Sequence, residues 1–159
     1  MDKFEIGVHI VTLAAAFALA IPIGWDREKR ARSAGLRTFP LVALASCGFI
    51  QASETMLAST PDGLSKVIEG LITGIGFIGG GAILKQGTTV QGTATAASLW
   101  ATGAIGVSVG LGSYDVAVTI AVFTFLTLRY MTLVKDDNDA TDGGSKNKDD
   151  DDEIKDKKD

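Results

Sequence analysis

The chain has 159 residues, of which 46% are hydrophobic, and its formal net charge at pH 7 is −4. The last 25 residues hold 11 acids against 6 lysines, a net charge of −5, so the first 134 residues carry +1. The sequence offers no broad basic patch, no Gly-x-x-x-x-Gly-Lys loop and no metal-spaced His/Cys cluster. It therefore argues against nucleic-acid binding and soluble-enzyme chemistry, and we expect no enzyme activity and no cofactor.

Five apolar segments predict an all-α, polytopic membrane domain over residues 4–134. They are Phe4–Gly24, Phe39–Leu57, Val67–Leu84, Ala94–Gly112 and Tyr114–Val134. At about 1.5 Å per residue, each is roughly long enough to cross a hydrocarbon layer of about 30 Å. The segments are apolar nearly all round, which is typical of helices whose exterior lies in lipid.

The first segment has a competing interpretation as a cleaved export signal, because Ala16-Phe17-Ala18 is a small-x-small sequence. Such a signal needs positive charge before its apolar core. Here the basic cluster follows the core, so we favour a retained membrane helix.

The loop after the first segment, residues 25–38, carries both bases and acids. Its predicted functional residues are Asp26, Arg27, Glu28, Arg30, Gly35, Arg37 and Thr38. The positive-inside rule places this loop in the cytoplasm, which puts the N-terminus outside and, after five spans, the C-terminus in the cytoplasm. The charges could serve orientation alone, form a salt-bridge network, or bind an ion or phosphate head groups.

The third and fourth segments are rich in small residues. The candidates for helix packing, or for a re-entrant pore element, are Gly74, Gly76, Gly79, Gly80, Gly81, Thr95, Ser98, Trp100, Thr102 and Gly106. Small residues let membrane helices approach closely, so we expect these two segments to pack on each other as the centre of the domain. Trp100 is expected to pack between helices or to anchor near the interface.

No carboxylate is expected at the bilayer midplane, which argues against a Mg²⁺ pathway formed by one subunit alone. Glu69, near the outer end of the third segment, is the one candidate metal ligand, and no firm metal site is predicted. Residues 135–159 have too little apolar surface to fold and are predicted to be a disordered, charged cytoplasmic tail.

Two ordered motifs together resemble the MgtC/SapB family of bacterial inner-membrane proteins. The first is Gly24-Trp25-Asp26-Arg27-Glu28 with Ala34-Gly35-Leu36-Arg37-Thr38, and the second is Gly74-Ile75-Gly76-Phe77-Ile78-Gly79-Gly80-Gly81 with Thr95-Ala96-Ala97-Ser98-Leu99-Trp100. The resemblance covers about residues 5–134 and implies the hydrophobic domain without a folded cytoplasmic domain. Gln86 and Gln91 stand where the family often has an acid and a base, so activity that uses those charges is not implied.

The resemblance implies a non-enzymatic regulator linked to adaptation to low magnesium, whose partners are the lipid bilayer and other inner-membrane proteins. The alternative is a transporter or channel for Mg²⁺ or another cation, built as a homo-oligomer because one copy has few buried charges. A third, weaker hypothesis is a lipid-interacting module that uses Arg27, Arg30 and Arg37.

Overall fold

The computed structural model describes residues 3–57, 62–86 and 89–130. By internal contacts the chain divides into two units, Met1–Phe125 and Leu126–Asp159, and the second contributes only residues 126–130 to this description. The predicted tail, residues 135–159, lies outside the described residues.

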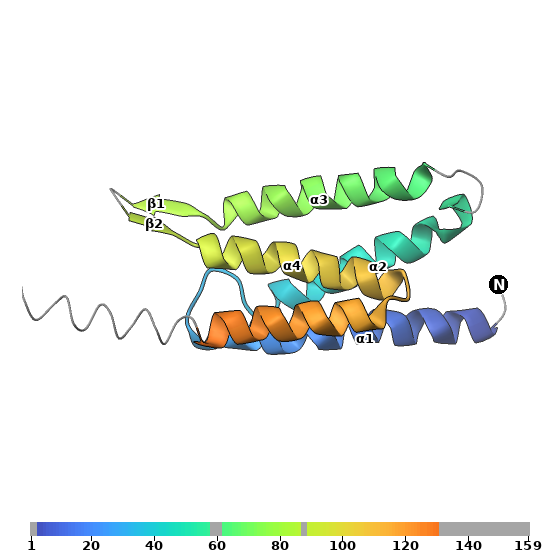
Figure 1. The fold of residues 1–159 in the computed structure, drawn as a ribbon, viewed down its shortest axis with the longest axis horizontal. Coiled ribbons are helices and arrows are strands. Elements are labelled where there is room, and N and C mark those ends of the chain that lie inside the picture. The colour runs from blue at the N-terminus through green and yellow to red at the C-terminus, as the bar shows by residue number, and fades with distance from the viewer. Residues whose placement is uncertain (1–2, 58–61, 87–88, 131–159) are drawn as a thin grey trace, which may run out of the picture. The chain divides into compact units, whose positions relative to one another are not determined.

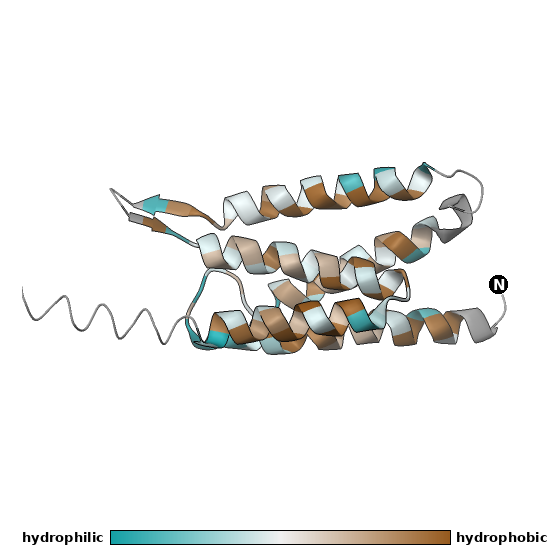
Figure 2. Ribbon diagram, viewed as in Figure 1, coloured by the Kyte–Doolittle hydropathy of each residue, from teal (hydrophilic) through white to brown (hydrophobic). Residues whose placement is uncertain are grey.

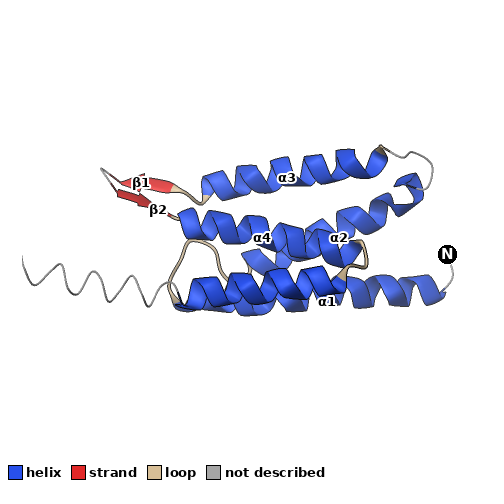
Figure 3. Ribbon diagram, in the orientation of Figure 1, coloured by secondary structure: helices blue, strands red, loops and turns tan. Residues whose placement is uncertain are grey.

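Within the described ranges the chain forms five helices, which confirms the predicted helical class (Figures 1 and 3). They are α1 (Lys3–Lys29), α2 (Thr38–Leu57), α3 (Gly63–Gly81), α4 (Thr93–Gly110) and a fifth helix over residues 114–130. The helix α1 continues past Pro22 to Lys29, whereas the apolar segment ends at Gly24. The first charged residues of the predicted loop are therefore helical.

The prediction of a purely helical fold is wrong between α3 and α4. Two short strands, β1 (Leu84–Gln86) and β2 (Thr89–Gln91), pair antiparallel with Lys85 opposite Val90 (Figure 3). Gly92 then has a φ of 90° as the chain turns into α4, a conformation that glycine adopts without steric cost. A Cβ at Gly92 would also overlap the carbonyl oxygen of Ala82.

Helices α2 and α4 form the centre of the first unit, because each contacts the other three labelled helices and their contact with each other is the most extensive. Small residues on α4 allow this approach. A Cβ added at Gly106 would overlap the carbonyl oxygen of Ala43 and lie 2.8 Å from the Cβ of Ser46. Gly106 therefore packs closely against another helix, but that helix is α2 and not the expected α3.

The predicted role of the α3 glycines in packing against α4 is largely wrong. A Cβ added at Gly74, Gly76, Gly80 or Gly81 would meet no described atom within 4 Å. Among these glycines, only Gly79 lies close to α4, where an added Cβ would be 3.5 Å from the carbonyl oxygen of Ala96. A second close contact between α3 and α4 is made by the side chain of Ile75, which lies against Gly103. Four of the five α3 glycines that were predicted to pack thus lie on an open surface.

One helix among the described residues, Ile6–Lys29, is long and apolar enough to cross a membrane, and its most apolar 18-residue stretch has a mean hydropathy of 2.2. Glycines together with Lys66 and Glu69 lower the hydropathy of α3, and small polar residues lower that of α4. Large apolar side chains are nevertheless exposed on several helices, including Phe77 at 86% and Phe123 at 67%. Figure 2 shows hydrophobic residues, in brown, along each helix. The five-span topology and its orientation stay predictions.

Candidate functional site

The last turns of α1 carry two charged side chains that are buried. Asp26 and Arg27 are 6% and 4% exposed, whereas the next residues, Glu28 and Lys29, are exposed. Because these residues are helical, Asp26 and Arg30 are one turn apart, and the Nε of Arg30 donates to both carboxylate oxygens of Asp26 at 3.2 Å. The structure thus contains the ion pair that the loop sequence allowed.

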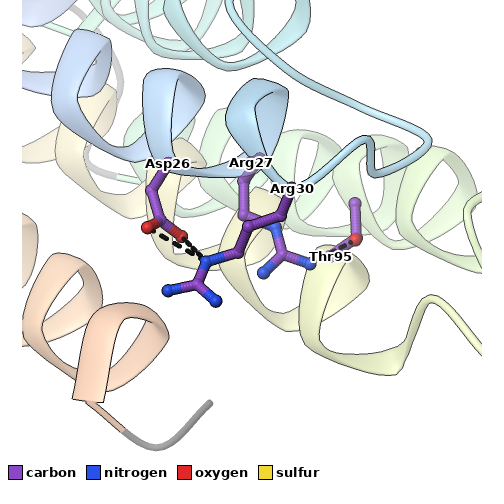
Figure 4. Close-up of polar contacts among 4 residues, drawn as sticks. All are labelled: Asp26, Arg27, Arg30 and Thr95. Atoms are coloured by element: carbon purple, nitrogen blue, oxygen red, sulfur yellow. Dashed lines mark hydrogen bonds and ion pairs between the residues drawn. The ribbon is translucent and has the colours of Figure 1, made fainter. Parts of the chain in front are cut away.

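Arg27 reaches across the helices to the start of α4. One of its terminal nitrogens donates to the hydroxyl oxygen of Thr95 at 2.9 Å, and Figure 4 shows the two side chains pointing toward each other. The two residues are 68 positions apart in the sequence. This bond joins the two motifs that carry the family resemblance.

The environment of Arg27 is unusual for a buried cation. Thr95, which accepts its hydrogen bond, is neutral, and the Nε of Arg27 has no hydrogen-bond partner among the described residues. Buried charges are normally paired because leaving water is costly for them. Asp26, the adjacent carboxylate, is already held by Arg30, so the Asp26–Arg27–Arg30–Thr95 cluster has an excess of one positive charge.

A row of buried hydroxyls continues from the cluster along α4. Ser98 donates to the carbonyl oxygen of Thr95 at 2.9 Å, and Thr102 donates to that of Ser98 at 2.8 Å. All three side chains are buried, and the hydroxyl protons of Ser98 and Thr102 bond within their own helix. These two hydroxyls can therefore lie among apolar neighbours without a partner on another helix.

Glu28 and Gly35 organise the loop that follows α1. The Oε2 atom of Glu28 accepts a hydrogen bond from the backbone N–H of Leu36 at 3.0 Å. A Cβ at Gly35 would overlap this carboxylate, so a larger residue there would displace the side chain of Glu28. The carbonyl oxygen of Gly35 accepts from the N–H groups of Thr38 and Phe39, which begins α2.

The other predicted site residues lie away from this cluster. Arg37 and Thr38 line a groove between α2 and α3, and Glu69 is exposed on α3. Among the residues that the structure describes, no group of three or more His, Cys, Asp or Glu side chains could hold a metal ion. Trp100 is 52% exposed, so it is not enclosed between helices, and its role as an interfacial anchor stays a prediction.

Two contacts, one made by Trp25 and one by Ser46, were not predicted from the sequence. The ring of Trp25 lies 4.0 Å from the ammonium group of Lys29, a cation–π contact that the i, i+4 spacing could have suggested. Ser46, buried on α2 against Gly106, had no sequence signal beyond its small size.

With the two motifs joined in space, comparison with known proteins decides the family. The MgtC family matches residues 13–136. The chain belongs to the MgtC family. It is 40% identical over 114 residues to Protein MgtC of Salmonella typhimurium (strain LT2), which covers 72% of this chain and 48% of that protein.

A second relative, Protein MgtC of Brucella abortus (strain 2308), is 42% identical over 111 residues, covering 70% of this chain and 46% of that protein. The chain thus spans about half the length of the curated relatives it matches. No solved structure matches it. The resemblance inferred from the motifs is confirmed at the level of the family.

Proposed function

We propose that this chain is a five-span inner-membrane protein of MgtC type that works without catalysis, by binding other membrane proteins, in adaptation to low magnesium. The observation that carries the proposal is the buried hydrogen bond from Arg27 to Thr95. It fixes the end of α1 to the start of α4, at the base of the charged loop.

The cluster supports recognition more than proton transfer. A guanidinium group is a poor proton donor in general, and the carboxylate of Asp26 is held by Arg30. Around this buried cluster the side chains of Lys29, Arg32 and others are exposed. A charged surface supported by a rigid, buried cluster is suited to selecting a partner by electrostatic complementarity.

The test joins a growth assay to a flux assay. A chimera of residues 13–125 of this chain with the second half of Salmonella Protein MgtC is expressed in a Salmonella strain that lacks that protein. We expect it to restore growth at low magnesium, and Thr95→Val to weaken the rescue. In proteoliposomes the intact chain should move no Mg²⁺ above the level of empty vesicles; flux above that level, or no rescue by the chimera, refutes the proposal.

One observation favours the second candidate, an oligomeric cation channel. The glycines on the outer surface of α3 leave space in which another copy could pack, with Glu69 on the same helix. This candidate predicts Mg²⁺ or monovalent cation flux that disappears with Glu69→Gln. Flux that is unchanged by Glu69→Gln would remove it.

A further inference from the structure

An open groove of about 840 Å³ runs between α2 and α3, and none of the Arg27 cluster residues lines it. Its walls include Leu41, Ala45 and Phe49 on α2, spaced four residues apart and therefore on one helix face. Gly70 and Gly74 form part of the opposite wall. The groove is hollow because a Cβ at either glycine would meet no described atom within 4 Å.

The groove has the length and lining of a site for an alkyl chain. From Thr38 to Ser53, both of which line it, α2 rises about 22 Å at 1.5 Å per residue. That length exceeds one leaflet of hydrocarbon, roughly 15 Å or half of the core thickness. Leu41 and Phe49 are 56% and 59% exposed, so the apolar wall is uncovered.

Each end of the groove has one basic residue. Arg37 lies at the end where α2 begins, and Lys66 lies at the other end, where α3 begins. Asp62 and Glu69 are close to Lys66 on the same helix and offset its charge, whereas the Arg37 end follows a basic loop. The Arg37 end is therefore the one that favours an anion.

We propose that this groove binds one anionic phospholipid, with an acyl chain between α2 and α3 and the head-group phosphate at Arg37. A guanidinium group matches phosphate geometry through paired N–H donors. The inference goes beyond the proposed regulatory function and rests on the proposed placement of α2 and α3 in the bilayer.

A second copy of the chain fits the groove less well. Two copies in one membrane are related by an axis along the membrane normal, so an interface through this face would place equivalent residues at the same depth. Arg37 would then lie near the partner's Arg37 and Lys66 near the partner's Lys66. Like charges placed together oppose association, whereas a lipid phosphate neutralises them.

The test is native mass spectrometry of the full chain in detergent, titrated with phosphatidylglycerol and with phosphatidylcholine of the same acyl chains. Gly74→Leu fills the groove, and Gly76→Leu is its matched control, because both positions are open but only Gly74 lines the groove. We expect Gly74→Leu to weaken binding of both lipids about tenfold, equivalent to roughly two buried methylene groups, and Gly76→Leu to leave it unchanged.

The charge is tested by Arg37→Gln against Arg32→Gln, an exposed arginine that does not line the groove. Arg37→Gln should weaken phosphatidylglycerol binding about fivefold, as expected for one basic group at an anionic surface, and leave phosphatidylcholine binding unchanged. Arg32→Gln should change neither.

Equal effects of Gly74→Leu and Gly76→Leu, or equal wild-type affinity for the two lipids, overturn the proposal. So does loss of a dimer in Gly74→Leu without a change in lipid binding, since the groove would then hold a second copy. Flotation of the chain with vesicles tests the membrane placement separately. The growth assay reports on the regulatory function whatever the groove binds.

Discussion

The close contact between α4 and α2 makes a specific prediction for Gly106. Alanine is favoured over glycine in a helix by about 1 kcal/mol, so Gly106→Ala would stabilise the protein if the site were open. In the structure the added Cβ overlaps the carbonyl oxygen of Ala43 and lies 2.8 Å from the Cβ of Ser46, well inside the 3.5 to 4.0 Å of an ordinary carbon–carbon contact. Overpacking of this kind costs about 1 to 3 kcal/mol, so after the gain in helix propensity the net loss should be about 0 to 2 kcal/mol.

The matched control is Gly76→Ala on α3, where the added Cβ meets no described atom within 4 Å. This variant should be neutral or more stable by up to about 1 kcal/mol. The assay is unfolding in mixed dodecyl sulfate micelles, followed by circular dichroism, with both variants measured against the wild type. If the two variants shift the unfolding midpoint equally, or if Gly106→Ala is the more stable one, the close α2–α4 approach is refuted.

Two further predictions concern the cluster and the turn before α4. Thr95→Val should destabilise the protein by about 1 to 3 kcal/mol, because it leaves the terminal nitrogen of Arg27 buried without its acceptor. Adding Arg27→Met should recover most of that loss, so additive losses in the double-mutant cycle would contradict the contact. Gly92→Ala should lower the unfolding midpoint more than Gly112→Ala, because both positions have positive φ but only Gly92 faces a carbonyl oxygen, that of Ala82; equal shifts would mean that φ alone matters.

The positions of the helices could be predicted from the sequence, because long apolar runs bounded by charged or glycine-containing turns fix where helices lie. The end of α1 could not be placed from hydropathy, since Asp26 to Lys29 are polar yet remain helical. The strands β1 and β2 have three residues each, too few to establish an alternating pattern.

The candidate site was predicted in its parts and not in its assembly. Ser98, Thr102 and Gly106 were predicted as packing candidates, and their spacing of four residues puts them on one face of α4, but the sequence does not specify which helix covers that face. The same limit applies to Arg27 and Thr95, since each belonged to a recognised motif and only the fold brings them into contact. The groove between α2 and α3 had no sequence signal, because it depends on how little these two helices touch.

The central position of α4 has a consequence for biosynthesis. Helices α1 and α2 contact each other directly, but α3 contacts α4 more than it contacts α2. When the ribosome has made only the first 90 or so residues, α3 therefore has little to hold it against its predecessors. The synthesis of α4 is the step that fixes α3 to the rest, so a chain interrupted before residue 110 leaves a loose helix for quality-control proteases to recognise.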